Sequence, residues 1–449
     1  MDLAPQYTGS GGLLIHYGSP VITAKNTVLI PVKTGATGGF LVEARAGQTG
    51  AVLWSLPSDY RLPNAGPSWT PSFNPVLTPD GRLVMPASRG RLLVRSDPDA
   101  ATGTTSTLAF YGTACDAAPA TCDNSITINT PLTSDSHGNV FFGFSVSDAN
   151  PAGLLGGGIA RVAANGTGTY VLVSTAAGTA AMIKPMTNSA PALSADESTV
   201  YVVVNNLSVP RASGQLLALD SETLATKAKV SLVDPYSGVP AWINDIGTSS
   251  PTVGPDGDVY IGVLESAGSP HHFRGWLLHF DGTLSTSKTP ASFGWDITAS
   301  IVPTSMIPGY TGPSSYLLAI KYNDYATSGG SGQNRMAVVD PGQTQADPVL
   351  STVQVMKDVI TILGPTPNPD RVGTVEEWCI NTVAVDPLTS SVLVNSEDGK
   401  LYRWHLPTNS FTEQIALTAG LFEAYTPTAI GPDGRVYAIN NATLFSIGR

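Results

Sequence analysis

The sequence is poor in positive charge. Lysine and arginine number 23 in 449 residues, against 34 aspartates and glutamates, which gives a formal net charge of −11. Proteins that bind nucleic acids gather lysine and arginine into patches or stripes. No basic cluster of this kind occurs along the chain, so DNA and RNA are not expected as partners.

Long apolar runs are missing as well. No stretch approaches the roughly 18 to 20 apolar residues that a helix needs to cross a bilayer, so no membrane span is expected. The first residues, MDLAPQYTGSGG, have neither the charged nor the apolar region of a signal peptide. A start of this kind would also suit a mature secreted protein whose leader has been replaced by a start Met.

Cysteine is scarce, with only Cys115, Cys122 and Cys379. The first two flank the hexapeptide DAAPAT, where a turn can bring them together, and we expect a disulfide between them. The alternative is two free thiols in a cytosolic loop. Because disulfides persist in oxidising compartments, the expected bond favours a periplasmic or secreted protein. Cys379, next to Trp378, is expected to be a buried free thiol.

The sequence patterns of common catalytic sites are absent. There is no GxSxG, HExxH, paired CxxC or GxxxxGK[ST]. The glycine-rich stretches GLLGGG and SGGSGQ are not followed by a helical pattern and are interpreted as flexible loops. His271 and His272 are adjacent in a loop rich in glycine and proline, and a metal site needs several converging imidazoles. We therefore expect this pair to be exposed and no metal to be bound there.

What the sequence does have is a repeat. An apolar strand that opens on proline, a turn and a second apolar strand recur eight times, as in NPVLTPDGRLVMPA, SPTVGPDGDVYIGV and TPTAIGPDGRVYAIN. The second residues of the units are 20, 75, 131, 191, 251, 303, 383 and 427, so the spacings range from 44 to 80 residues. Strand repeats of this period indicate a β-propeller. We predict one all-β domain over residues 1–449, an eight-bladed propeller of four-stranded antiparallel blades with repeats at 19–449.

Turn chemistry and ring closure follow from the same units. The PDG triplets around Asp80, Asp256 and Asp433 are interpreted as tight turns, in which proline presets φ, aspartate caps and glycine accepts positive φ. The eighth unit ends after its third strand, at TLFSIG. We expect the N-terminal segment 1–18, through GGLLIHYG at 11–18, to complete this last blade and close the ring.

Several units resemble the repeat of the quinoprotein dehydrogenase-like propellers. The strand cores GDVYIGV and GRVYAIN, the segment GQLLALDSETLATKAKV from Gly214, and GQTGAVLWSL with Trp54 are similar to its Gly-x-Val-Tyr, Leu-x-Ala-Leu-Asp and Thr-Gly-x-x-x-Trp elements. The Thr-Gly…Trp ending is kept in one unit only. The resemblance covers the whole chain as a fold. For a member of that family, the resemblance implies bound pyrroloquinoline quinone (PQQ) with calcium, an Asp that acts as the base and a Trp beneath the cofactor. Many members also have adjacent cysteines.

The residue types of a quinoprotein calcium cluster are supplied here by Asn244, Asp245, Asp296 and Glu376. The cysteines Cys115 and Cys122, however, are not adjacent. The resemblance therefore carries the fold to this chain and leaves the cofactor as an alternative. No cofactor is predicted as the first interpretation.

The loops differ between the two faces of the predicted ring. On one face of the ring, the turns that join strands one and two and strands three and four of each blade are short; we call it the short-turn face. The other face carries long loops, and we call it the long-loop face. The long loops are SDANPAGLLGGG, NNLSVPRASG, ESAGSPHHFRG, YNDYATSGGSGQNR and the excursion through PTPNPDRVGTVEEW. Long insertions on one face typically mark the functional face of a repeat fold.

Aromatic and acidic residues gather on the long-loop face just before the inner strands. Such a mouth could bind a sugar, a cation or a quinone. Alternatively, the tryptophans cap the layers between blades and the acids form a solvated rim. The predicted ligand-binding residues are Trp69, Trp242, Asn244, Asp245, Trp295, Asp296, Glu376, Trp378 and Glu423, with Glu377 and Tyr425 beside them.

Function stays open between three readings. The leading one is a monomeric, non-catalytic protein that binds a small molecule, a glycan or a protein partner on the long-loop face. A glycan hydrolase or lyase would use Glu376, Glu377 and a carboxylate across the channel, such as Asp245 or Asp296. Adjacent residues of an extended chain point to opposite sides, which counts against Glu376 and Glu377 facing one substrate. The third reading is the quinoprotein oxidoreductase.

Overall fold

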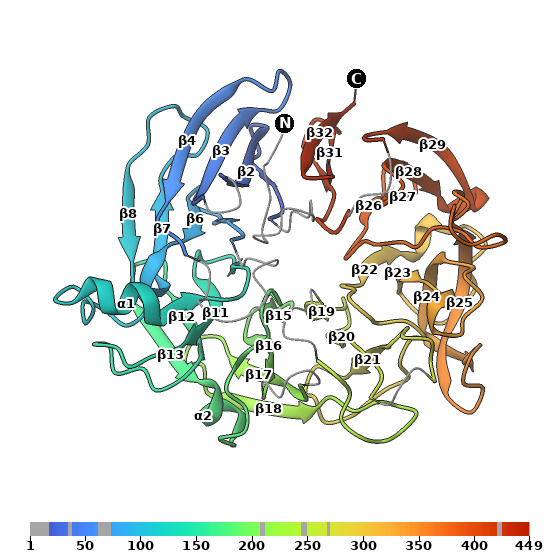
Figure 1. The fold of residues 1–449 in the computed structure, drawn as a ribbon, viewed down its shortest axis with the longest axis horizontal. Helices are drawn as coiled ribbons and strands as arrows, with labels where there is room; N and C mark the ends of the chain where they lie inside the picture. The colour runs from blue at the N-terminus through green and yellow to red at the C-terminus, as the bar shows by residue number, and fades with distance from the viewer. Residues whose placement is uncertain are drawn as a thin grey trace.

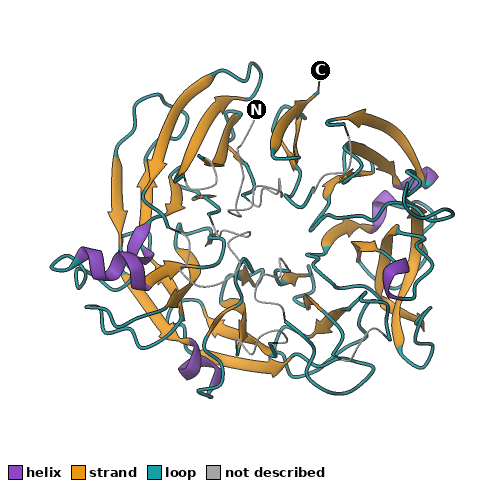
Figure 2. Ribbon diagram, in the orientation of Figure 1, coloured by secondary structure: helices purple, strands orange, loops and turns teal. Residues whose placement is uncertain are grey.

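Eight antiparallel sheets stand around a central axis in a computed structural model of the chain (Figure 1). It describes residues 18–34, 38–61, 73–206, 212–243, 249–266, 270–419 and 424–448. Figure 2 shows that strands make up the ring and that the short helices α1 (Pro119–Ser125) and α2 (Val173–Ala177) lie on its outer side. The predicted all-β, eight-bladed propeller is confirmed.

The strands of the first four blades run in order from the axis outward, except that in blades 3 and 4 the first two short strands both pair with the third. Blade 1 has β1 (Val21–Ile22), β2 (Thr27–Lys33), β3 (Phe40–Ala46) and β4 (Val52–Ser58); blade 2 has β5 (Val76–Leu77), β6 (Leu83–Pro86), β7 (Leu92–Arg95) and β8 (Thr105–Leu108). Blade 3 has β9 (Ile126–Ile128), β10 (Thr133–Ser134), β11 (Val140–Val146), β12 (Gly158–Val162) and β13 (Gly168–Leu172); blade 4 has β14 (Lys184–Pro185), β15 (Ala192–Leu193), β16 (Thr199–Asn205), β17 (Gly214–Asp220) and β18 (Thr226–Ser231).

The last four blades keep this order. Blade 5 has β19 (Thr252–Val253), β20 (Val259–Val263) and β21 (Trp276–Phe280); blade 6 has β22 (Ser300–Pro303), β23 (Tyr316–Tyr322), β24 (Arg335–Ala346) and β25 (Gln354–Leu363). Blade 7 has β26 (Ala384–Asp386), β27 (Ser391–Asn395), β28 (Lys400–His405) and β29 (Ser410–Ala416); blade 8 has β30 (Ala429–Ile430), β31 (Val436–Asn440) and β32 (Thr443–Ile447). Four 3₁₀ turns lie at Ser88–Gly90, Thr304–Met306, Ala326–Ser328 and Leu406–Thr408.

The second strand of each blade is the most apolar, and the packing explains why. β23 (YLLAIKY) and β20 (VYIGV) are buried along their whole length, because both faces of the blade pack against neighbouring blades. The outermost strands β18 and β29 are largely exposed. The core is therefore a series of apolar layers between adjacent blades, not one central cluster.

Hydroxyl side chains on the inner strands tie several blades to the next. The Thr133 hydroxyl donates to the carbonyl of Pro191 at 2.7 Å, and the Thr252 hydroxyl donates to that of Ala299 at 3.0 Å. The pattern repeats from Ser300 to Val383 at 2.8 Å. These bonds satisfy carbonyls that the short inner strands leave unpaired.

The PDG turns form as expected. The φ angles of Gly81, Gly257 and Gly434 are 78°, 89° and 82°, which lie in the left-handed region that glycine adopts at low cost. In one of these turns the Asp256 carboxylate accepts the backbone N–H of Asp258 at 3.1 Å. This aspartate therefore serves turn formation, as the sequence predicts.

The sixth unit begins earlier than its sequence phrase suggests. Its inner strand β22 starts at Ser300 and ends at Pro303, so the proline that was expected to open the strand closes it. A 3₁₀ turn at Thr304–Met306 follows directly. Because proline lacks a backbone donor, it is tolerated at such a strand end.

Blade 5 has a reduced outer edge, which blade 6 covers. β21 makes only isolated bridges to Ser287 and Ala291, where a four-stranded blade would have its outermost strand. The long β24–β25 hairpin reaches across, with the backbone N–H of Met356 donating to the carbonyl of Pro290 at 2.8 Å. Its residues Val353 and Val355 belong to the apolar cluster of blades 4 and 5. Covering the edge in this way removes a site of unwanted strand pairing.

Blades 1 and 8 pack directly against each other. Val28 and Ile30 of β2 join Tyr437 and Ile439 of β31 in one cluster, and the Tyr437 hydroxyl donates to the carbonyl of Gly47 at 3.2 Å. Among the described residues blade 8 has three strands. The segment expected to supply its fourth, 11–18, lies outside the described residues except for Gly18, so closure by the N-terminal strand stays a prediction.

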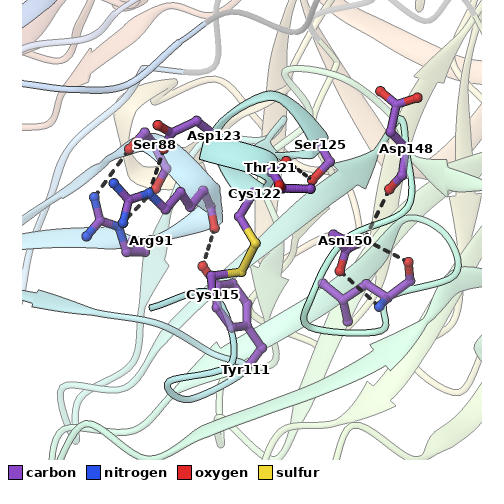
Figure 3. The surroundings of a disulfide bond; sticks show 12 residues. Ser88, Arg91, Tyr111, Cys115, Thr121, Cys122, Asp123, Ser125, Asp148 and Asn150 are labelled. Carbon is purple, nitrogen blue, oxygen red and sulfur yellow. Dashed lines mark hydrogen bonds and ion pairs between the residues drawn. A yellow bond between two sulfur atoms is a disulfide. The ribbon is translucent and has the colours of Figure 1, made fainter. Parts of the chain in front are cut away.

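The predicted disulfide is present. Cys115 and Cys122 are bonded, with their Cα atoms 6.1 Å apart; both are buried, and Cys122 belongs to α1 (Figure 3). Nearby, the Tyr111 hydroxyl donates to the carbonyl of Arg89 at 2.7 Å. Cys379 is buried and is not part of a disulfide, as expected. The disulfide is compatible with an extracytoplasmic location. Within the described ranges, no helix is long and apolar enough to cross a bilayer.

Candidate functional site

The long-loop face lies where the sequence placed it. Strands one and two of each blade are joined by short turns on the opposite side of the ring, whereas segments such as 147–157 and 323–334 join strands two and three on this side. The excursion at 364–383, between β25 and β26, returns from the rim to the axis on the same side. This excursion carries the densest group of titratable residues among the predicted positions.

Only some of the predicted site residues can be placed. Trp242 and Trp295 are half-buried, and Asp296 and Glu376 are buried. Four other predicted residues lie outside the described residues: Trp69, Asn244, Asp245 and Glu423.

Trp378, the remaining predicted residue, lies in the core. Its side chain is 1% exposed and lies edge-on to Tyr402, with ring centroids 5.9 Å apart, and close to Phe411 at 6.1 Å. Its backbone N–H donates to the Asn323 side chain at 3.1 Å. The ring therefore packs between blades 6 and 7, as in the capping alternative, and presents no face to a ligand.

Trp242 and Trp295 are held by their backbones. Trp242 exchanges two N–H···O bonds of 3.0 Å with Leu264, which joins the approach to blade 5 to the end of β20. The N–H of Trp295 donates to the carbonyl of Arg274 at 2.9 Å. The next residue, Asp296, has a φ of 57°, so a strained turn positions its carboxylate.

Three glutamates and a thiol meet at the junction of blades 6 and 7; we call Glu376, Glu377, Glu397 and Cys379 the glutamate cluster. One ligand atom each from Glu377, Cys379 and Glu397 lies within 4.8 Å of the other two. Glu377 and Cys379 are two apart on an extended chain, which puts them on the same side. Glu397 comes from the turn between β27 and β28. Two separate loops thus build the cluster.

Glu376 joins the cluster from the adjacent position. Its carboxyl is within hydrogen-bonding reach of Glu397 and close enough to Glu377 for their charges to repel. One of its oxygens, Oε2, accepts from the Asn368 amide at 3.2 Å. The other, Oε1, is buried, and no donor among the described residues reaches it; the residue is 7% exposed. Glu397 therefore connects two glutamates that were expected to point apart.

Burial dominates the electrostatics of the cluster. It raises the pKa of Glu376, and the negative charge of Glu377 adds to the increase. Burial also raises the pKa of Glu377, which the Lys321 ammonium partly offsets. The Lys321 side chain is almost fully buried at the end of β23, 5.9 Å from the ring centre of Phe293. Lys321 is therefore the one cation that the described residues bring to bear on Glu377.

Asp296 shares the same environment. Burial raises the pKa of Tyr325 well above its ordinary value, and the negative charges of Glu377 and Asp296 act in the same direction. Both carboxylates therefore lie within electrostatic reach of one phenol. Of the predicted residues, Glu376 and Asp296 are thus brought to one region, whereas Trp378 is packed beneath it.

Sequence reasoning missed Glu397 and Lys321. Glu397 lies in the short turn SEDG and looks like an ordinary turn acid, and Lys321 ends an apolar strand. A usable signal was present, because Lys321 lies near the end of a second strand and Glu397 just after the end of another, both on the long-loop face and next to the inner segment 376–379. Following register across neighbouring blades would have pointed to them.

A second acidic group lies on the short-turn face, but its atoms are committed to the fold. The Asp135 carboxylate accepts the backbone N–H groups of His137 and Asn139 at 3.0 and 2.8 Å, and Glu197 accepts the N–H of Ser136 at 2.9 Å. These bonds cap two turns.

The histidine pair is not exposed, contrary to expectation. His271 is fully buried, stacks on Trp276 at 3.8 Å and places Nε2 3.1 Å from the Asp347 carboxylate. His272 places Nδ1 2.7 Å from Asp324. Burial opposes ionisation of Asp347, but the bonds from His271 and the backbone outweigh it and lower its pKa to about 2. The expectation was wrong because the blade 6 hairpin covers this loop.

Comparison with known proteins shows the fold alone. The sequence matches no protein-family model and no curated protein. A europium-containing methanol dehydrogenase superposes with a TM-score of 0.58 at 11% identity, over 96% of this chain and 83% of that one. The quinohemoprotein alcohol dehydrogenase from Comamonas testosteroni gives 0.54 at 14%, over 97% and 71%. Sqt1 of Saccharomyces cerevisiae gives 0.55 at 10%, over 100% and 98%.

This chain therefore has the propeller fold of the quinoprotein dehydrogenases, as the resemblance implied. Proteins with unrelated names share that fold at similar scores, so the fold does not select an activity. Asn244 and Asp245, two of the four residues predicted for a calcium cluster, lie outside the described residues, so the quinone cofactor stays an alternative. Among the described residues, the Trp378 ring is packed between blades and offers no floor, and the disulfide cysteines are seven residues apart.

Proposed function

We propose that this propeller is an extracytoplasmic binding protein, without catalytic activity, whose long-loop face holds a cationic ligand at the glutamate cluster. The supporting observation is the state of Glu376. Its Oε1 is buried without a donor among the described residues and lies in a group of three carboxyls. A buried acceptor without a partner costs about 1–3 kcal/mol. A bound cation would remove that cost.

The charge balance supports a cation over a neutral ligand. Lys321 is the only cation that acts on Glu377 among the described residues, whereas Glu376, Glu377 and Glu397 supply up to three negative charges. The raised pKa values of Glu376 and Glu377 indicate that protons compete for this site. Carboxylates with a nearby thiol suit a divalent metal ion or an organic ammonium group.

The test is calorimetric titration with calcium, manganese, zinc and tetramethylammonium chlorides in turn. At least one is expected to bind, and Glu377→Gln with Glu397→Gln is expected to weaken that binding by at least tenfold. Glu222→Gln, an exposed turn residue on the other face, makes the same charge change and should bind as the wild type does. Absence of binding by all four cations, or equal binding by the double variant, would overturn the proposal.

The raised pKa values also favour one catalytic candidate. A carboxyl with a raised pKa keeps its proton to higher pH than an ordinary glutamate, which is what a general acid in glycan cleavage requires. If the protein is a glycan hydrolase or lyase, incubation with a polysaccharide panel releases reducing ends, and Glu376→Gln abolishes the release. Release that survives this substitution would remove Glu376 from that role.

A further inference from the structure

A separate cleft lies on the short-turn face between blades 5 and 6. It has a volume of about 570 Å³, within the range of roughly 300–1,000 Å³ typical of small-molecule sites. Its walls come from the turn after β19, which carries Asp256 and Asp258, and from the segment that leads into β23, with Ser315 and Tyr316. All of its lining residues are independent of the glutamate cluster.

One wall of the cleft is a fixed hydrogen-bonded group. The Lys288 ammonium contacts both oxygens of the Asp258 carboxylate, at 2.7 and 2.5 Å, and Nε2 of His279 lies 2.8 Å from the same carboxylate. His279 stacks on Tyr260, with ring centroids 4.5 Å apart. Burial lowers the pKa of His279, which favours the neutral imidazole, although Asp258 acts in the opposite direction.

The Asp256 part of the lining is fixed through a pair of tyrosines. The Tyr316 hydroxyl donates to Oδ1 of Asp256 at 2.8 Å and lies 2.6 Å from the Tyr260 hydroxyl. Both tyrosine side chains are buried. The Asp256 carboxylate is therefore held in place before any ligand arrives, which reduces the entropy lost on binding.

Open hydrogen-bonding groups remain at the rim. Within the described part of the chain, no donor reaches Oδ2 of Asp256 and no partner is recorded for the Ser315 hydroxyl. Lys288 has one N–H beyond the two that Asp258 takes. Apolar surface lies beside them at Pro313 and Pro341. Acceptor, donor and hydroxyl thus lie together next to ring-shaped apolar faces.

This combination selects a neutral ligand with hydroxyl groups. Asp256 repels anions, and because Lys288 already balances Asp258, the remaining groups are too few to hold a metal ion. A hydroxyl both donates and accepts, so vicinal hydroxyls can pair with Asp256 and Lys288 together while a sugar ring rests on the prolines. We propose that the cleft between blades 5 and 6 binds a neutral saccharide.

The experiment uses the full chain on an array of neutral oligosaccharides, followed by calorimetry with the disaccharide unit of any that binds. Asp256→Asn should weaken binding at least tenfold, because the amide cannot accept at both positions. Asp433→Asn changes the equivalent PDG turn of blade 8, away from the cleft, and should bind unchanged. Ser315→Ala, at an exposed position, serves as a second variant that does not threaten folding.

The possible outcomes are distinct. Binding that falls in Asp256→Asn and Ser315→Ala and persists in Asp433→Asn supports the proposal. No binding to any neutral oligosaccharide, binding confined to amino sugars, or binding unaffected by Asp256→Asn overturns it. Because Glu377→Gln with Glu397→Gln should leave sugar binding intact, failure here and failure of the cation site can be told apart.

Discussion

Two groups of carboxylates in this propeller have pKa values shifted in opposite directions. Asp196 accepts bonds from the hydroxyls of Ser194 and Ser198, which lower its pKa to about 2, and Asp347 reaches a similar value through His271. In Glu376 and Glu377 burial dominates and raises the pKa. Neighbouring groups donate hydrogen bonds to the carboxylates of the first group, whereas the carboxylates of the second group have too few hydrogen-bond donors.

The difference separates structural acids from candidate ligand-binding ones. An aspartate whose oxygens accept hydrogen bonds from nearby donors stabilises its own turn or loop, and its negative charge needs no further partner. A buried glutamate without enough donors destabilises the fold at neutral pH unless something else supplies positive charge. Perturbed pKa values of the second kind typically mark functional positions.

The largest loss of stability is expected from removing a buried hydrogen-bond acceptor of the first group. Asp347→Ala leaves the buried His271 side chain and the N–H groups of Val349 and Leu350 without their acceptor. Breaking a buried pair on one side costs about 3–5 kcal/mol. Urea unfolding measures the loss. A cost below about 1 kcal/mol would show that the pair is not held in solution as described.

A change of opposite sign is expected in the glutamate cluster. Without a bound cation, Glu377→Gln removes a partly buried charge and should raise the free energy of unfolding by about 1 kcal/mol at pH 7. Melting in the presence of a chelator measures it, with Glu222→Gln as the matched control. If Glu377→Gln lowers stability under these conditions, the carboxylate is compensated by groups that the charge balance above leaves out.

Acid titration should divide the two groups by pH. Asp347 has a folded pKa below its ordinary value, so its contribution is present above pH of about 4 and is lost as the pH falls towards about 2. Glu376 and Glu377 have raised pKa values, so their destabilising effect is relieved as the pH falls from neutral. The difference in melting temperature between wild type and Glu377→Gln should therefore shrink on acidification. A constant difference would contradict the assignment.

The fold could be predicted because its information is local and repeated. Apolar second strands recur in all eight units and PDG turns in three of them, and each specifies the same hairpin whatever its neighbours. The start of β22 was misplaced because Pro303 resembles the proline that opens other units. The cover that the β24–β25 hairpin gives to blade 5 could not be read either, since it depends on contacts between distant segments.

The candidate site could be predicted only in outline. The long-loop face and Glu376 follow from insert lengths and from the acids before an inner strand. Glu397 and Lys321 were missed because their role depends on which blades are adjacent. His271 was misjudged for a related reason, since a glycine- and proline-rich loop gives no sign that a neighbouring blade will bury it.

The smallest loss of stability is expected from a substitution of Asp196. This substitution tests whether burial or the number of hydrogen-bond donors decides how much an acid stabilises the fold. Its carboxylate accepts from Ser194 at 2.6 Å and from the Ser198 hydroxyl and backbone N–H at 2.9 and 3.1 Å, yet it is exposed. Water can replace these donors, so Asp196→Ala should move the melting temperature by about 1 °C or less. A drop as large as that of Asp347→Ala would mean that donor number alone sets the contribution of an acid. The expected contrast instead makes burial decisive, which is why we propose a ligand at the glutamate cluster and not at the exposed turn acids.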